Sequence, residues 1–184
     1  MEDLNKSESI QYPEITAEIT LMYNADQVMR KRWEEYNMLP EWPEEPEEDR
    51  TRDSRNTARM IEIVEQIGWP TVSKVGGKAS GDAWLLVQHA DKNVEFQKHC
   101  LELMKAEPVG EVALHDIAYL EDRVRVNSNQ PQLYGTQFRW EGNNPVQNIE
   151  DPEHVEERRK EMGLNTLAKN LEEMYQKYNI EKPE

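Results

Sequence analysis

The residues best suited to chemistry follow an apolar segment, where Gln88, His89 and Asp91 stand close together. An imidazole gains or loses its proton near neutral pH, so His89 is a candidate general acid or base. The other interpretation is a core histidine that serves packing, and the sequence leaves both open. If His89 is catalytic, Asp91 or Asp122 would orient its ring or stabilise its charge.

A second polar group lies further along the chain and includes Asp122, Arg123 and Tyr134. Arg30 and Arg123 are candidates to anchor a carboxylate, because a guanidinium donates two parallel hydrogen bonds. Ordinary surface charge is the competing interpretation of Asp122 and Arg123. The expected catalytic residues are His89, Asp122 and Tyr134. The expected substrate-binding residues are Arg30, Gln88, Arg123, Gln132 and Gln137.

No serine, cysteine or lysine stands in a recognised nucleophile motif, so we expect cofactor-free acid–base chemistry, such as hydrolysis, elimination or isomerisation. A metal held by His89 with Asp91, His115 and Asp122 is an alternative. However, the sequence has no H-E-x-x-H, no E-x-x-H and no paired C-x-x-C motif. Its glycines at 76, 77 and 81 match neither a P-loop nor a dinucleotide-binding fingerprint.

The charge balance narrows the choice of partner. The chain has 184 residues and a net charge of -15, which opposes binding to nucleic acid or to an anionic membrane. A small polar molecule is therefore the expected partner, and the alternative is an acidic interaction protein, such as an immunity or regulatory protein. A single cysteine excludes an intrachain disulfide. With no signal peptide or membrane span recognised, we expect a cytoplasmic protein.

The elements that must position these residues are mostly helices. Apolar residues recur at three- and four-residue steps from Glu14 to Asn37, which predicts one long helix. Asp26 falls within that apolar stripe, which indicates either a salt bridge with Arg30 or a place on a pocket wall. The apolar segment of residues 83–91 is expected to be a central buried helix, capped by residues 80–82.

Prolines and glutamates at residues 40–52 predict an acidic connector, either a solvated linker or a docking strip for a basic partner. Further helices are expected after a cap at Asp53 or Ser54, after Asp91 or Asn93, and along the apolar stripe from Ala113 to Val124.

The C-terminal region changes character, because aromatic and β-branched residues predict a short β-hairpin at about residues 133–149. Within it, Gly135 indicates a bulge or a close approach by another group. Asp151 before Pro152 is typical of a helix start, and Asn165 is a candidate cap for a last helix. The predicted fold is mainly α, a single-domain helical bundle at residues 14–179 with one hairpin, between loose ends at 1–13 and 180–184.

Several short motifs together resemble those of a bacterial family known only as a domain of unknown function. They are D-Q-x-x-R at Asp26–Arg30, D-x-x-N-T at Asp53–Thr57, G-W-P at Gly68–Pro70, V-G-G-K-A at 75–79, Q-H-A-D at Gln88–Asp91 followed by Gln97, A-Y-L-E-D-R-V at Ala118–Val124, P-Q-L-Y-G-T-Q at Pro131–Gln137 and E-D-P-x-x-V-x-x-R-R at Glu150–Arg159. The resemblance covers roughly residues 15–165. It implies a bacterial source and a compact domain, and it implies that the candidate site residues at motif positions are not arbitrary surface choices.

Overall fold

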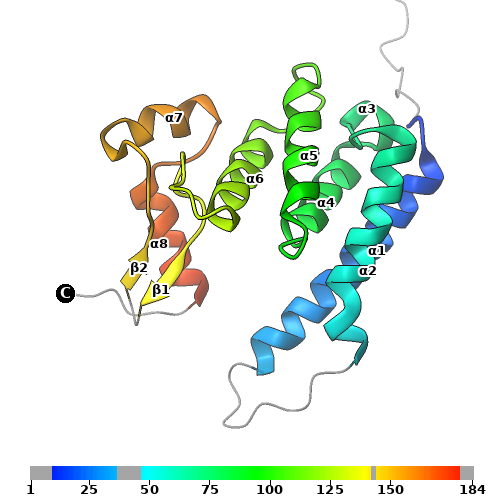
Figure 1. Cartoon of the computed structure of the whole chain (residues 1–184), viewed down its shortest axis with the longest axis horizontal. Coiled ribbons are helices and arrows are strands. Elements are labelled where there is room, and N and C mark those ends of the chain that lie inside the picture. Colours follow the sequence, from blue (N-terminus) through cyan, green and yellow to red (C-terminus); the bar gives the residue numbers. More distant parts are fainter. Residues whose placement is uncertain (1–9, 37–46, 142–143, 179–184) are drawn as a thin grey trace, which may run out of the picture. The chain divides into compact units, whose positions relative to one another are not determined.

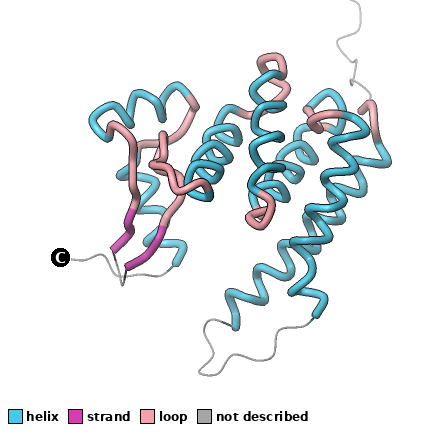
Figure 2. Tube along the Cα trace, viewed as in Figure 1, coloured by secondary structure: helices cyan, strands magenta, loops and turns pink. Residues whose placement is uncertain are grey.

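The computed structural model describes residues 10–36, 47–141 and 144–178 and confirms the mainly α class (Figures 1 and 2). The chain divides into two compact units, Met1–Val112 and Ala113–Glu184. We call them the N-terminal unit and the C-terminal unit. The predicted single domain over residues 14–179 stays a prediction. Of the predicted loose ends, 1–13 and 180–184, residues 1–9 and 180–184 lie outside the described part of the chain.

The N-terminal unit is built from helices around one central helix. Its elements are α1 (Pro13–Tyr36), α2 (Glu47–Ile67), α3 (Val72–Val75), α4 (Gly77–Gln88) and α5 (Val94–Ala106). In Figure 1, α1 and α2 run side by side as two long helices. The central position predicted for the apolar segment is correct, because α4 contacts α1, α2, α3 and α5.

Helix α1 confirms the long helix that the apolar stripe predicts. Ile15, Ile19 and Met29 lie on its buried face. Removing such side chains from water contributes about 1.5–3 kcal/mol each, which fixes the face that α1 turns inward. Asp26 lies on the same face and is fully buried, so its carboxylate must be paired within the unit.

The predicted start of α4 is wrong, because the helix begins at Gly77 rather than after residues 80–82. Gly76 has a φ of 82°, and this left-handed backbone, which glycine adopts readily, turns the chain from α3 into α4. Asp82 therefore lies inside the helix, where it accepts hydrogen bonds from Lys78 (2.6 Å) and Thr20 (3.3 Å). Trp84 and Leu85 are partly exposed, so the apolar segment is not covered on all sides.

Helix α2 also begins earlier than predicted, at Glu47, so residues 47–52 of the expected connector are helical. Three acidic residues occupy its first turn, where the positive end of the helix dipole stabilises negative charge. One of them, Asp49, accepts a 2.6 Å hydrogen bond from Arg32 of α1. Residues 40–46 of the predicted connector lie outside the described part of the chain.

The C-terminal unit combines helices with a small hairpin. Its elements are α6 (Leu114–Asn127), β1 (Arg139–Glu141), β2 (Asn144–Val146), the 3-10 helix η1 (Pro152–His154), α7 (Val155–Glu161) and α8 (Leu167–Tyr178). The strands pair antiparallel, with Arg139 opposite Val146. The predicted hairpin over residues 133–149 is therefore too long, because residues 133–136 form a loop whose backbone N–H groups bond to a side chain.

Two helix starts in this unit use other caps than predicted. Asp151 precedes η1 as expected, but its φ of 45° is left-handed and its carboxylate bonds to Nδ1 of His154 at 2.8 Å instead of capping the helix. Before α8, the Oγ1 of Thr166 accepts the N–H of Lys169 at 3.3 Å, so Thr166 takes the place predicted for Asn165.

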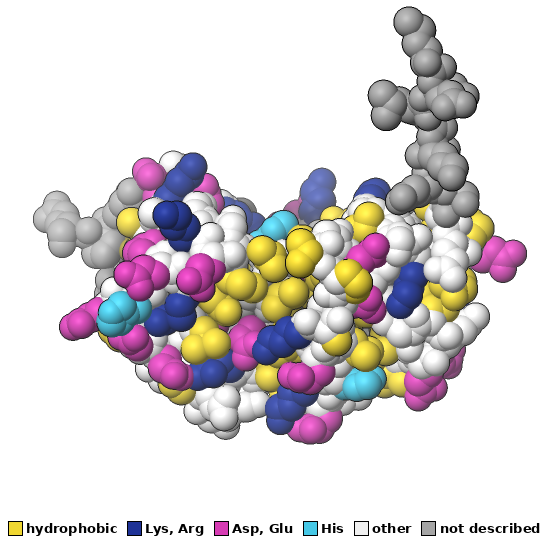
Figure 3. Space-filling view, turned by 90° about the horizontal axis from the view of Figure 1, so that it is seen from above, with side chains coloured by type: hydrophobic (Ala, Val, Ile, Leu, Met, Phe, Trp, Pro, Cys, Tyr) yellow, Lys and Arg dark blue, Asp and Glu magenta, His cyan; other side chains and the backbone are white. Residues whose placement is uncertain are grey.

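The surface of the molecule is mixed in charge on the face shown in Figure 3, where acidic and basic side chains are interspersed. Charges of both signs on neighbouring side chains weaken the local field that the net charge would produce. Within the described ranges, no helix is long and apolar enough to cross a membrane.

Candidate functional site

His89 lies at the C-terminal end of α4 and bonds to Asp26 of α1. Its Nδ1 is 3.1 Å from the Asp26 carboxylate, and the two side chains are 17% and 0% exposed. A carboxylate on one ring nitrogen fixes the orientation of an imidazole and favours the tautomer with the proton on that nitrogen. Asp26 therefore orients His89, a role for which the sequence suggested Asp91 or Asp122.

The end of α4 is held in place by Gln97 of α5, which is fully buried. Its amide nitrogen donates to the carbonyls of Val87 (3.1 Å) and Gln88 (3.3 Å) and to Asp91 Oδ1 (3.4 Å). These bonds satisfy carbonyls that a helix end leaves without an internal partner. The side chain of Gln88 is buried, and its oxygen accepts no hydrogen bond from any described residue.

Arg30 joins two carboxylates beside His89. Its Nη2 donates to Asp26 at 3.3 Å, which confirms the predicted salt bridge, and to Asp53 of α2 at 2.7 Å. The guanidinium also lies over the ring of Trp33, 5.2 Å from its centroid. Arg30, predicted to bind substrate, is thus engaged with groups of the protein.

The surroundings push the pKa values of these two aspartates in opposite directions. Burial raises the pKa of Asp26, but His89, Arg30 and Gln27 together outweigh it, so this pKa lies below its ordinary value. Burial raises the pKa of Asp53, and Arg30 and His89 offset the rise only in part. The lowered pKa of Asp26 favours its ionised form beside His89, as a partner that orients an imidazole requires.

In the C-terminal unit, Asp122 holds the loop at residues 133–136. Its fully buried carboxylate accepts the N–H groups of Leu133 (2.7 Å), Tyr134 (3.1 Å) and Thr136 (2.9 Å) and the hydroxyl of Thr136 (2.9 Å). Burial raises the pKa of Asp122, and these hydrogen bonds oppose the rise. Asp122 is thus a positioning residue for the loop, and its interpretation as a surface charge is wrong.

The carbonyls of the same loop are held by arginine. Arg159 of α7 is 1% exposed and donates to the loop carbonyls of Tyr134 (2.6 Å) and Gly135 (3.4 Å). It also donates to the carbonyl of Asn165, outside the loop, at 2.7 Å. Tyr134 thus contributes its backbone N–H to Asp122 and its carbonyl to Arg159. Burial also raises the pKa of the Tyr134 hydroxyl, which makes this predicted catalytic residue a weaker acid.

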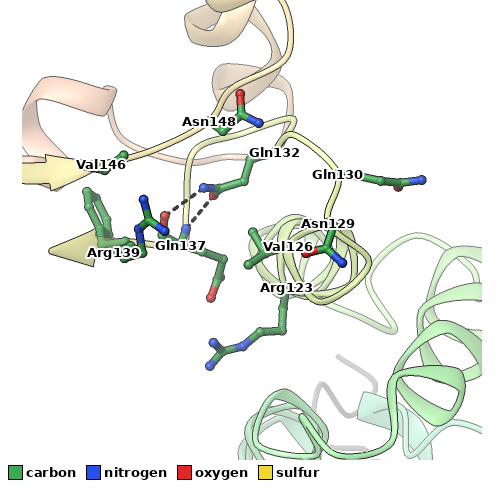
Figure 4. A pocket seen from close by; sticks show the side chains of 10 residues that line it. Arg123, Val126, Asn129, Gln130, Gln132, Gln137, Arg139, Val146 and Asn148 are labelled. Atoms are coloured by element: carbon green, nitrogen blue, oxygen red, sulfur yellow. Dashed lines mark hydrogen bonds between the residues drawn. The ribbon is translucent and has the colours of Figure 1, made fainter. Parts of the chain in front are cut away.

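Gln132 and Gln137 meet within the C-terminal unit. Gln132 accepts the backbone N–H of Gln137 at 2.8 Å and donates to its carbonyl at 2.9 Å (Figure 4). Both line a cavity of about 430 Å³, which Arg123 of α6 also lines. Three of the five predicted substrate-binding residues therefore share one cavity.

One family model matches most of the chain. A model of a family of unknown function matches residues 13–181. The chain belongs to this family, DUF6624. This confirms the resemblance seen in the sequence. No curated protein and no solved structure matches the chain.

The metal alternative named His89, Asp91, His115 and Asp122 of this DUF6624 chain as ligands. Among the described residues, no three His, Cys, Asp or Glu side chains are grouped so that they could hold a metal ion. His115, one of the suggested ligands, lies 3.3 Å from Asp116.

Two residues outside the predicted site belong to these networks, namely Asp53, which the sequence offered only as a helix cap, and Arg159. Both stand in the motifs D-x-x-N-T and E-D-P-x-x-V-x-x-R-R, which were the available signal. The pairing of Asp26 with His89 has no such signal, because 63 residues separate the two in sequence.

Proposed function

We propose that this chain is an enzyme that acts on a small polar molecule by acid–base chemistry at His89. The observation that carries the proposal is the hydrogen bond from the imidazole to the fully buried carboxylate of Asp26. With Nδ1 facing Asp26, the other ring nitrogen, Nε2, is the atom that exchanges a proton with a substrate. The partial exposure of His89 supports access to that atom.

Asp26 and Arg30 have positioning roles in this proposal. Asp26 holds the ring and stabilises the imidazolium that forms when Nε2 takes a proton. Arg30 balances the charges of Asp26 and Asp53, since its guanidinium bonds to both. Arg30 therefore holds the pair of Asp26 and His89 in place rather than anchoring a substrate carboxylate.

Covalent catalysis through the cysteine is disfavoured by its surroundings. Cys100 is fully buried, and burial raises the pKa of its thiol to about 12. Since the thiolate is the reactive form, this residue is a poor nucleophile near neutral pH. Acid–base reactions such as hydrolysis, elimination or isomerisation therefore fit the site best.

The test compares the metabolites consumed by the wild type with those consumed by His89→Gln. Each protein is incubated with a polar metabolite extract, and substrates and products are followed by mass spectrometry. We expect His89→Gln to lower turnover of any consumed metabolite by about 10²-fold or more, the usual contribution of general acid–base catalysis. His99→Gln is the matched control, because His99 is exposed on α5.

Two results would contradict the proposal. One is turnover by His89→Gln at the rate of the wild type. The other is a combination of two observations: His89→Gln fails to fold, and Nε2 of His89 in the wild type does not react with diethyl pyrocarbonate. A histidine that is needed for folding and is closed to the reagent serves packing. The alternative is an acidic interaction protein. It would be supported if His89→Gln changed no measured property while charge reversal at Glu47 and Glu48 abolished binding to a partner protein.

A further inference from the structure

The cavity in the C-terminal unit has a charge opposite to that of the chain around it. Arg123 and Arg139 line it, and none of its lining residues is acidic, although the chain has 37 acidic residues against 22 Lys and Arg. We propose that this cavity binds a small carboxylate that also carries a hydroxyl or amino donor. This proposal does not depend on the role of His89.

The polar floor of the cavity is rigid. Gln132 is 3% exposed and is locked by its two hydrogen bonds to the backbone of Gln137. The amide nitrogen of Gln137 donates to the carbonyl of Tyr119 (3.3 Å) and to Oγ1 of Thr136 (3.0 Å). This fixes the Gln137 carboxamide with its oxygen as the acceptor, so a ligand must bring a donor to it.

The two guanidinium groups suit a planar anion. In Figure 4, the side chains of Arg123 and Gln137 extend to the same side of the cavity from different elements. Arg139 pairs with Glu141 at 2.5 Å, but both are largely exposed, and an exposed pair of this kind is weak enough for a ligand to displace. A carboxylate can then bond in the bidentate mode that arginine favours.

The volume and the apolar walls of the cavity suit a ligand of the size of a small metabolite. Its volume of about 430 Å³ is at the small end of the range for ligand sites. Phe138, Val126 and Val146 supply apolar wall for a short carbon skeleton. A donor and a carboxylate on such a skeleton describe a hydroxy acid or an amino acid.

The test is an NMR titration of the full chain at low salt with L-malate, citrate and L-glutamate. Succinate, which lacks the donor, and inorganic phosphate are the comparison probes. We expect at least one of the first three to bind with a Kd below about 1 mM and to shift the side-chain amide signals of Gln137. Succinate is expected to bind about 10-fold more weakly, since it leaves the Gln137 oxygen unpaired.

Variants assign the binding to the cavity. Arg123→Gln is expected to weaken it about 10-fold or more, and Arg139→Gln less, because Arg139 is exposed. Lys169→Gln removes an equal charge elsewhere in the unit and is expected to leave binding unchanged. Val126→Trp keeps both arginines but fills the cavity, so it is expected to abolish binding even if Arg123→Gln does not fold.

The proposal is overturned if none of the three probes binds at about 10 mM. Binding of phosphate alone overturns the carboxylate assignment, and binding that survives Val126→Trp overturns the location. Because the titration measures binding without turnover, its outcome is independent of the metabolite test on His89.

Discussion

The two units of this chain treat their buried charges differently. In the N-terminal unit, Asp26 bonds to other side chains, namely those of His89, Arg30 and Gln27. In the C-terminal unit, Asp122 bonds mainly to backbone N–H groups and Arg159 to backbone carbonyls. The first arrangement links helices whose backbone groups already form hydrogen bonds within the helix. The second supplies a loop with the backbone hydrogen bonds that a helix or strand would otherwise provide.

This difference has a physical cause. Buried backbone groups must find hydrogen bonds, and residues 133–136 belong to neither helix nor strand. The amides of Leu133, Tyr134 and Thr136 therefore depend on the Asp122 carboxylate. Removal of one charge in the C-terminal unit leaves several backbone groups unpaired, whereas removal of one charge in the N-terminal unit leaves side chains that can turn toward water.

The largest effect is expected from Asp122→Asn. The asparagine would point its NH₂ group at backbone N–H groups that now donate to the carboxylate. Because some of these N–H groups would then lack an acceptor, we expect a loss of about 3 kcal/mol or more in the free energy of unfolding. Urea denaturation followed by circular dichroism measures it. Glu153→Gln, at an exposed position of the same unit, is the control, with an expected change within about 0.5 kcal/mol. An effect of Asp122→Asn as small as that of the control would show that the loop does not depend on this carboxylate.

The next effect compares one glycine from each unit. Gly135 has a φ of 64°, and a Cβ there would lie 2.6 Å from Cδ1 of Ile149, so Gly135→Ala is expected to cost about 2 kcal/mol. A Cβ on Gly81, inside α4, would meet nothing within 4 Å. Gly81→Ala is therefore expected to stabilise by about 0.5–1 kcal/mol. Thermal unfolding measures both.

The double variant Gly135→Ala with Ile149→Val separates the two causes of this loss. Since valine lacks the Cδ1 atom, the clash with Ile149 is relieved, while the 3.0 Å contact with Leu167 and the left-handed backbone remain unfavourable for alanine. We expect the double variant to be less destabilised than the sum of the single changes. Strict additivity would show that the contact with Ile149 is unimportant.

A smaller effect, with a defined pH dependence, is expected from Asp26→Asn. The pKa of Asp26 is lowered in the fold, so its charge stabilises the protein above the ordinary aspartate pKa of about 4. That contribution is lost as the pH falls through the folded-state pKa. We expect Asp26→Asn to cost about 1–2 kcal/mol at pH 7 and less at pH 3, measured by urea denaturation at both values. A difference that grows toward low pH contradicts the lowered pKa.

The smallest effect has the opposite sign and concerns Asp116 in α6. Burial raises its pKa to about 6, so the fold favours its protonated form. The resulting stability is present below the ordinary pKa and is lost as the pH rises through 6. Asp116→Asn, which cannot ionise, is expected to be about 1 kcal/mol more stable than the wild type at pH 8 and equal to it at pH 4. A constant difference across that range would contradict the raised pKa.

Sequence periodicity predicts the helical elements well, because burial of an apolar face determines them. Helix α1 lies within one residue of its predicted start and end, and Asn93 caps α5 as expected by accepting the N–H of Phe96. The start of α2 was less predictable, since its first turn depends on acidic residues that also fit a connector.

The sequence singled out residues that the structure brings together, but it did not indicate their pairings. Arg123, Gln132 and Gln137 share a cavity, but no pattern indicated that Asp26 would bond to His89. The burial of Asp122 was missed because a loop without periodicity follows it, and this loop supplies the hydrogen bonds that make the burial stable.

The most direct measurement of the proposed acid–base site is the protonation of the His89 ring by nitrogen-15 NMR at pH 8. The account predicts a proton on Nδ1, the nitrogen that faces Asp26, and an Nε2 that reacts with diethyl pyrocarbonate. In Asp26→Asn, the proton is expected to distribute over both nitrogens, since no carboxylate then favours Nδ1. A proton held on Nε2 and protected from exchange with solvent would contradict the account and assign His89 to the core.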